Sequence, residues 1–276
     1  MGITFDTFQF LRYCKNSGVN FESTCQIGRQ SCMFSSKKHG IKNGDFAEPL
    51  FCFLGAENVV SVDYSDYENA SMIHDMNLPV AEDMKEKYSA VIDGGTLEHV
   101  FNYPVAIKNC MQMVKIGGHL ILVTPANNLY GHGFYQFSPE LFFSLLSEEN
   151  GFAEAQILIQ DDSLQWYRVK NPKEIKSRVD ICCAKNTECL IRVVSRKKHP
   201  TPENLTVLQS DYVEVWKNTD NDNEKSIAGF GAKGWKIAVK QLVKKIIPGC
   251  VLDSIKKSMR RKMLYERVNV NNLTEI

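Results

Sequence analysis

Two short apolar runs separated by a helical pattern constrain the fold of this chain more than any other feature. Residues 90–92 are apolar and lead directly into Asp93 and two glycines, while residues 120–123 lead into Thr124 and Pro125. Short, fully apolar runs joined by a helix are typical of parallel β-strands, which are buried on both faces and connected by a crossover helix. Ligands of such sheets bind beyond the carboxyl ends of the strands. We therefore expect the polar residues after the two runs to share one cleft.

The same stretch carries a family resemblance. The string from Ile92 to Val100, IDGGTLEHV, and the string from Ile116 to Pro125, IGGHLILVTP, resemble class I S-adenosylmethionine-dependent methyltransferases. In that family a Leu-Glu-His-Val sequence follows strand four and a Gly-Gly turn opens strand five. The resemblance implies an α/β fold with a Rossmann-like, seven-stranded sheet in the order 3-2-1-4-5-7-6. It also implies S-adenosylmethionine as cofactor and S-adenosylhomocysteine as product.

The remaining strands are expected around these two. Apolar patterning places them at Glu22–Ile27, Val59–Asp63, Ser71–His74, Ala155–Gln160 and Glu188–Val194. Asp45 followed by Glu48 resembles a capping box that starts a helix ending at Gly55. Ser138 and Pro139 are expected to start another helix as N-cap and first helical residue.

Charge divides the chain unevenly. The net charge is +1, yet residues 233–267 contain eleven Lys or Arg against two acidic residues, a net +9, which leaves −8 for the rest. We expect four parts: an N-terminal cap helix in residues 1–20, a methyltransferase core in 21–196, a linker in 197–232 and a basic amphipathic helical tail in 233–276. The N-terminal helix either covers the sheet edge or caps the cofactor cleft.

The basic tail leaves two interpretations open. Its lysines can face an anionic membrane surface, or the helix can pack on its own domain or on a sister subunit of a homo-oligomer. Aromatic side chains do not interleave with the basic ones, so we expect no nucleic acid partner. Because no run of eighteen apolar residues and no secretion signal is present, we expect a cytoplasmic protein, with peripheral contact at the inner membrane surface if the tail binds lipid.

Cysteine spacing argues against a metal site. Nine cysteines are scattered without regular spacing, which is typical of reduced thiols. Cys182, Cys183, Cys189 and His199 are candidate zinc ligands, but they lack a Cys-x-x-Cys pair. We expect no metal.

The resemblance also implies which residues bind the cofactor: Gly28, Gln30, Asp63, Tyr64, Asp75, Met76, Asp93, Gly94 and Gly95. An acid at the end of strand two, such as Asp63, suits both ribose hydroxyls, although it can also be a turn-forming residue. Asp75 and Met76 match the adenine contacts of the family, or an ordinary turn before a helix. The loop after strand one keeps only Gly28 of the glycine-rich pattern. Either Gln30 replaces contacts with bare backbone, or the site has decayed.

The acceptor is expected beside the loop after strand five. His132 lies there between two glycines, with three aromatic residues just after it. If the acceptor is a hydroxyl, a base is needed, and we expect His132 ahead of His99, with Tyr135 also catalytic. Aromatic packing of a long loop is the alternative for His132 and Tyr135, and structural packing for His99. The segment 161–187 is expected to emerge on the same side or to be an irregular surface loop, so the expected substrate contacts are Tyr130, Tyr135, Trp166 and Arg168.

These residues favour a methyltransferase. Similar Tyr-Gly-His and Phe-Ser-Pro-Glu strings occur in methyltransferases of surface-glycan pathways, so we expect O-methylation of a sugar, a phosphate-bearing glycan or a related small molecule in surface-polysaccharide biosynthesis. The alternative is a non-catalytic, methyltransferase-like module that docks to a partner or an anionic membrane through its tail. A nicotinamide-dependent dehydrogenase would need the Gly-x-Gly-x-x-Gly loop that is missing here.

Overall fold

The computed structural model describes residues 2–160, 164–175, 178–179, 189–213, 216 and 264–268. The strands are β1 (Gly2–Ile3), β2 (Ser23–Ile27), β3 (Ser31–Cys32), β4 (Asn58–Asp63), β5 (Met72–Ile73), β6 (Tyr88–Asp93), β7 (Val114–Pro125), β8 (Gln156–Gln160), β9 (Trp166–Val169), β10 (Leu190–Arg196) and β11 (Tyr265–Val268). The α-helices are α1 (Phe5–Asn16), α2 (Glu48–Phe53), α3 (Tyr103–Met113), α4 (Pro139–Leu145) and α5 (Pro172–Ile175). Short 3₁₀ turns lie at Lys37–His39, Glu82–Met84, Leu97–His99 and Glu148–Asn150.

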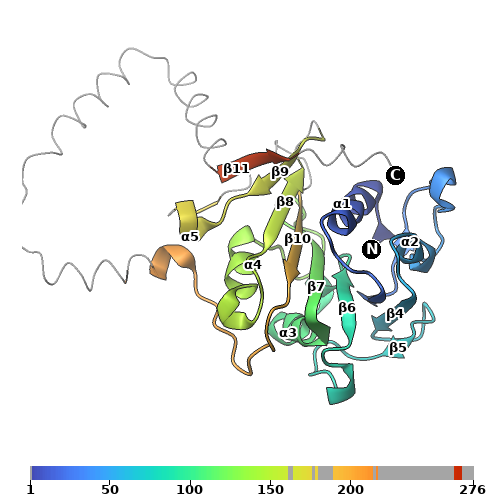
Figure 1. Ribbon diagram of the computed structural model, residues 1–276, viewed down its shortest axis with the longest axis horizontal. Helices are drawn as coiled ribbons and strands as arrows, with labels where there is room; N and C mark the ends of the chain where they lie inside the picture. The colour runs from blue at the N-terminus through green and yellow to red at the C-terminus, as the bar shows by residue number, and fades with distance from the viewer. Residues whose placement is uncertain are drawn as a thin grey trace, which may run out of the picture.

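A single large sheet dominates the fold (Figure 1). Its nine strands follow the order β11-β9-β8-β10-β7-β6-β2-β4-β5, and a separate small sheet pairs β1 with β3. The neighbouring strands β7, β6, β2, β4 and β5 are all parallel. Strand β10 runs antiparallel between β7 and β8. The α/β class is thus confirmed. The strand count is not, because β9 and β11 extend the edge beyond β8.

Helices cover both faces of the sheet (Figure 1). On β6, Ala90 and Ile92 pack with residues of α1 and α2, whereas Val91 packs with residues of α3 and α4. This alternation follows from the two-residue period of a strand. Both faces are apolar, as the two runs of the sequence predicted for a buried parallel sheet. No helix among the described residues is long and apolar enough to cross a membrane.

The segment after β8 was predicted as a loop on the substrate side, and this prediction was wrong for residues 166–169. Residues 166–169 form β9, which pairs antiparallel with β8 on one side and β11 on the other. Trp166 is buried there, with the guanidinium of Arg192 4.6 Å from the centre of its ring. A tryptophan with such a partner stabilises an added strand, so it cannot remain in a solvent-exposed loop.

The predicted capping box is absent. Helix α2 begins at Glu48 with Ala47 as N-cap, and no side chain caps it. The Asp45 carbonyl instead accepts a hydrogen bond from the amide of Cys32 at 2.8 Å. Pairing of this segment with the residues after β2 therefore delays the helix until residue 48. Ser138 is the N-cap of α4, as predicted, but its side chain makes no capping bond.

The predicted linker begins too early, because residues 197–213 belong to the domain. The ammonium group of Lys197 is buried and donates to the carbonyls of Met111 at 3.1 Å and Val114 at 2.9 Å. Thr206 exchanges hydrogen bonds with the side chain of Asn150. These bonds hold residues 197–213 against the α3 and α4 side of the sheet.

Most of the predicted tail lies outside the described residues, as do Cys182 and Cys183. The end of its basic segment, predicted as helix, is the strand β11 instead. Leu264 and Tyr265 are buried in the same core cluster as α3 and α4. Cys14, Cys25, Cys32, Cys52 and Cys110 form no disulfide among the described residues.

Candidate functional site

The predicted cofactor residues gather at one edge of the sheet. Asp63 and Asp93 are the last residues of β4 and β6, Gln30 follows β2, and Asp75 follows β5. Because these four strands are parallel neighbours, their carboxyl ends share one edge. Adjacent strands lie about 4.8 Å apart, so the four side chains form a row across the sheet.

Gly28 brings two loops into contact. Its φ of +68° is a conformation that favours glycine, and a β-carbon there would lie 2.4 Å from Oγ1 of Thr96. Thr96 follows β6, and its hydroxyl donates to the carbonyl of Ile27 at 2.9 Å. One glycine is therefore enough to let the loop after β2 pack directly against the loop after β6.

Gln30 fills the space between these loops. Its side chain is buried, and Nε2 donates to the carbonyl of Ile27 at 3.3 Å and to Oγ1 of Thr96 at 3.1 Å. The amide oxygen Oε1 is buried without a hydrogen-bond partner among the described residues. A β-carbon on Gly94 would lie 3.2 Å from this oxygen. Gln30 therefore presents an unused acceptor to the Gly94 backbone.

Asp93 presents a second unused acceptor. Oδ1 accepts from the amides of Thr96 at 2.8 Å and Leu97 at 3.3 Å, whereas Oδ2 is buried with no partner in the described part of the chain. Burial raises the pKa of Asp93 to about 7, against the effect of these hydrogen bonds. Such a group attracts a hydrogen-bond donor or a cation.

Asp63 is oriented by two backbone amides. Oδ2 accepts from Arg29 at 3.1 Å and Oδ1 from Tyr64 at 2.7 Å. Each oxygen retains a further lone pair for a ligand hydroxyl. The side chain of Tyr64 is 74% exposed, so it is available to cover a ligand at this position.

Asp75 and Met76 form the predicted turn. Oδ1 of Asp75 accepts from the backbone amide of Asn77 at 2.9 Å and from its side chain at 2.8 Å. These hydrogen bonds lower the pKa of Asp75, which therefore carries a negative charge at neutral pH. Met76 is buried beneath the turn.

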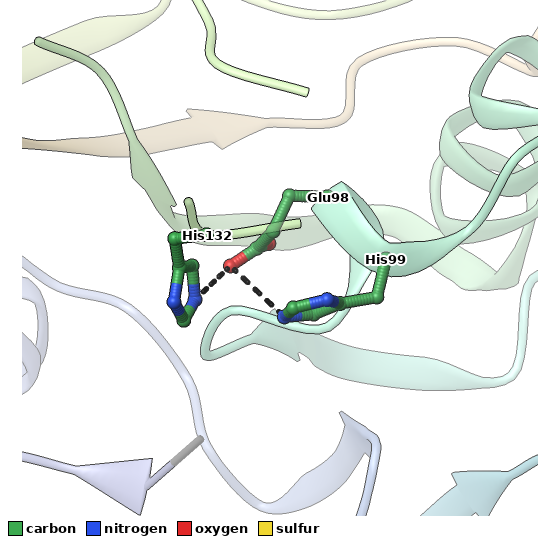
Figure 2. Close-up of side chains that lie close together, drawn as sticks. All are labelled: Glu98, His99 and His132. Atoms are coloured by element: carbon green, nitrogen blue, oxygen red, sulfur yellow. Dashed lines mark ion pairs between the residues drawn. The ribbon is translucent and has the colours of Figure 1, made fainter. Parts of the chain in front are cut away.

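A second group of side chains lies at the ends of β6 and β7. Glu98 and His99 belong to the 3₁₀ turn after β6, and His132 belongs to the loop after β7. Oε1 of Glu98 lies 3.4 Å from Nε2 of His132 and 4.0 Å from Nε2 of His99 (Figure 2). The sequence predicted His132 and His99 at this edge, and the structure brings them together through Glu98.

Backbone contacts hold His132 in place. The amide of Phe134 donates to the carbonyl of Glu98 at 2.8 Å. Gly133 has a φ of +75°, and a β-carbon there would lie 2.8 Å from the same carbonyl. The glycine beside His132 therefore allows the loop to approach the turn that carries Glu98.

Glu98 is in an unusual environment. The residue is completely buried, yet neither carboxylate oxygen has a hydrogen-bond partner among the described residues. Burial, helped by the nearby Asp93, raises the pKa of Glu98 to about 8. Burial and the neighbouring His132 lower the pKa of His99. Sequence reasoning gave Glu98 no role, although it lies within the string that carries the resemblance.

The aromatic residues of this region divide into packed and exposed ones. The hydroxyl of Tyr135 donates to the carbonyl of Phe101 at 2.6 Å, and its ring lies against Tyr103 and Phe137. Tyr135 is thereby engaged in packing. Three side chains remain largely exposed: Tyr130, Phe101 and Phe134, at 83%, 75% and 68%. Phe101 and Phe134 form an edge-to-face pair, and neither was predicted because no sequence pattern separated them from core aromatics.

Trp166 and Arg168 do not join this group. Three strands, β8, β10 and β7, lie between β9 and β6. Trp166 is buried, and Nη2 of Arg168 donates a hydrogen bond to the hydroxyl of Tyr13 at 3.3 Å. Both stabilise the far edge of the sheet, so we leave them out of the site.

Comparison with known proteins adds structural likeness only. No protein-family description and no curated protein matches the chain. The crystal structure of MccD protein is 12% identical, covers 70% of this chain and 97% of its own, and has a TM-score of 0.40. A putative methyltransferase from Bacillus halodurans is 13% identical, with 70% and 99% covered and a TM-score of 0.41. N-methyltransferase NodS from Bradyrhizobium japonicum, in complex with S-adenosyl-L-homocysteine, is 13% identical, with 70% and 87% covered and a TM-score of 0.40. At such identities and TM-scores these proteins identify neither a substrate nor a catalytic residue of this chain.

Proposed function

We propose that this protein is an S-adenosylmethionine-dependent methyltransferase that transfers the methyl group to a hydroxyl. One observation carries the proposal: the carboxyl ends of four neighbouring parallel strands present acceptors in the order Asp75, Asp63, Gln30, Asp93. The Glu98–His99–His132 group lies beyond the last of them. A row of acceptors beside a cluster of ionisable side chains suits a long polar cofactor with an acceptor at one end.

The residues present fit the cofactor. Asp75 would bind the adenine amino group, and Asp63 the two ribose hydroxyls, because each has carboxylate lone pairs oriented by backbone amides. The unpartnered oxygens of Gln30 and Asp93 would bind the ammonium group of the methionine part. When bound, the cofactor supplies a methyl group activated on a sulfonium. The loop with one glycine therefore does not exclude binding, since Gln30 provides an acceptor in place of bare backbone.

The chain's own residues would align the acceptor and remove its proton. Methyl transfer is an in-line displacement, so positioning and exclusion of water contribute most of the rate. A hydroxyl must lose its proton as its oxygen attacks. His132 would accept that proton at Nδ1, because its Nε2 is buried and faces Oε1 of Glu98 at 3.4 Å, where an ionised Glu98 would stabilise the imidazolium.

A sugar or related small molecule is the acceptor that we propose. Support comes from the exposed Phe101, Phe134 and Tyr130 around the His132 loop, because the apolar faces of sugar rings stack on aromatic side chains. The resemblance to glycan-pathway methyltransferases points the same way. We therefore propose O-methylation of a sugar or phosphate-bearing glycan of surface-polysaccharide biosynthesis. The alternative of a docking module rests on basic residues that lie, except for the end of the segment, outside the described part of the chain.

Calorimetry with S-adenosylhomocysteine tests the proposal directly. We expect one binding site on the full chain and a matching rise in its melting temperature. Absence of both effects would contradict the methyltransferase proposal and favour the docking module. Where binding is found, transfer of labelled methyl groups to sugars, nucleotide-linked sugars and phosphorylated glycans identifies the acceptor class.

A further inference from the structure

We propose that Glu98, His99 and His132 bind one divalent transition-metal ion, and that this ion holds the acceptor hydroxyl. Binding of the ion is inferred from the side chains alone, whereas its contact with the acceptor hydroxyl rests on the proposed function. The sequence predicted no metal because its cysteines lack the spacing of zinc ligands, whereas this group contains no cysteine.

The geometry is close to that of a coordination sphere. One ligand atom from each of the three side chains lies within 4.8 Å of the other two. Ligands about 2.1 Å from a common ion are separated by about 3.0–3.4 Å in octahedral or tetrahedral geometry. Glu98 Oε1 and His132 Nε2 already lie 3.4 Å apart, and His99 Nε2, 4.0 Å from Oε1, needs a small rotation.

The burial of unpartnered polar atoms independently favours a bound ion. A carboxylate without hydrogen bonds is expensive to bury, and most buried polar groups have partners. Glu98 is completely buried with both oxygens unpartnered, and Nε2 of His132 likewise has no hydrogen-bond partner in the described structure. Both imidazoles direct Nε2 toward the same carboxylate oxygen (Figure 2). A cation between the three atoms would satisfy all of them.

The donor set indicates the class of ion. Two imidazoles and one carboxylate suit first-row transition ions such as Mn²⁺, Co²⁺ or Zn²⁺ better than Ca²⁺ or Mg²⁺, which prefer oxygen. Three protein ligands leave coordination positions open, as in catalytic rather than structural sites. The side chains of His99 and His132 are 46% and 31% exposed, so two of the three ligands border solvent.

An ion here would change the role of His132. A hydroxyl coordinated to a divalent cation has a lowered pKa, so its O–H bond can break with the proton passing to solvent water. The oxygen then forms a bond to the methyl carbon as the methyl–sulfur bond breaks, and the sulfonium becomes a neutral thioether. His132 would act as a ligand rather than as the base. Two open positions would favour an acceptor with two adjacent hydroxyls.

Titration with Mn²⁺, followed by the paramagnetic resonance signal of the free ion, tests the site. Mn²⁺ is the probe of choice because the chain has nine cysteines, which would bind Zn²⁺ elsewhere. We expect one ion per chain, bound at least about tenfold more weakly by Glu98→Gln, His99→Ala and His132→Ala. His199→Ala is the matched control, since His199 is exposed and lies outside the group. Unchanged binding in all three variants, or equal loss in the control, would overturn the proposal.

Two further measurements keep the test decisive. His99→Ala alters a half-exposed side chain, so this variant should fold even if Glu98→Gln disturbs the core, and circular dichroism verifies each fold. Co²⁺ added to the metal-free chain should give weak visible bands of nitrogen and oxygen ligation. Intense thiolate charge-transfer bands removed by alkylating the cysteines would instead locate the ion elsewhere and overturn the proposal.

The metal site and the proposed function can fail separately. Binding of S-adenosylhomocysteine without Mn²⁺ binding would contradict the metal site but not the methyltransferase proposal. Mn²⁺ binding without S-adenosylhomocysteine binding would keep the site and remove the methyltransferase. If both bind, methyl transfer should fall at least tenfold after chelation and dialysis and recover with added Mn²⁺; full activity without metal would overturn the ion's role in transfer.

Discussion

Oδ2 of Asp63 accepts a hydrogen bond from the backbone amide of Arg29 at 3.1 Å, which joins the end of β4 to the loop after β2. Arg29 is itself fixed, because its side chain pairs with Glu48 at 2.8 Å and stacks on Phe46 at 3.8 Å. A carboxylate held this way loses little freedom when a ligand binds, which suits the ribose contact that we propose for Asp63.

Asp63→Ala should weaken binding of S-adenosylhomocysteine by about 1.5–3 kcal/mol, or roughly 10- to 150-fold, because hydrogen bonds to charged groups are lost. Calorimetry on folded protein measures the change. Asp66→Ala, which removes an exposed acid from the same loop, should leave affinity unchanged. Normal affinity in folded Asp63→Ala would rule out the ribose assignment.

Gly28→Ala should destabilise the protein and weaken cofactor binding together. The added β-carbon would lie 2.4 Å from Oγ1 of Thr96 at a φ of +68°, so the loops must separate. Gly40→Ala is a matched control, because Gly40 has a φ of +67° with nothing within 4 Å of its β-carbon. We expect Gly40→Ala to cost about 1 kcal/mol in urea unfolding and Gly28→Ala about 2–4 kcal/mol. Equal costs would show that the Thr96 contact does not matter.

His132→Ala should lower turnover by about 10²- to 10⁴-fold while S-adenosylhomocysteine affinity is kept. Loss of a base and loss of a metal ligand both predict this result, and Mn²⁺ binding by the same variant tells them apart. The exposed His199→Ala should turn over normally. Near-normal turnover of His132→Ala would reduce His132 to loop packing.

His119 should make stability depend on pH. Burial, with a smaller effect of Arg196, lowers its pKa to about 4, against an ordinary value of about 6.5. Between these values the unfolded chain binds more protons, so the free energy of unfolding rises with pH across that window. In urea unfolding from about pH 4 to 6.5, His119→Gln should show a smaller rise than the unaltered protein. A parallel rise in both proteins would contradict the assignment.

The central sheet could be predicted from the sequence because burial on both faces leaves a plain signal. The residues Ala90 to Ile92 cannot face water on either side, and their apolar run ends at Asp93, where β6 ends. Asp63 was likewise expected at the end of its strand and lies at the end of β4. Period and burial together predict where polar side chains emerge.

Long-range contacts could not be predicted in the same way. Nothing in the local pattern of Trp166 shows that Arg192 will lie over its ring, and without that contact β9 reads as a loop. A linker was predicted to begin at Lys197 because the residues there are polar. In the structure the ammonium group of Lys197 donates to carbonyls at the end of α3 and the start of β7. Glu98 gave no signal because its burial depends on the loop that brings His132 over it.

The pairing of β11 with β9 has a consequence for any shortened form of the chain. A protein cut before Leu264 loses Leu264 and Tyr265 from the core and exposes the edge of β9 that faces away from β8. An uncovered strand edge is a template on which other chains can add. We therefore expect the last few described residues to protect against aggregation, although four strands separate β11 from β6, which leads into the candidate site.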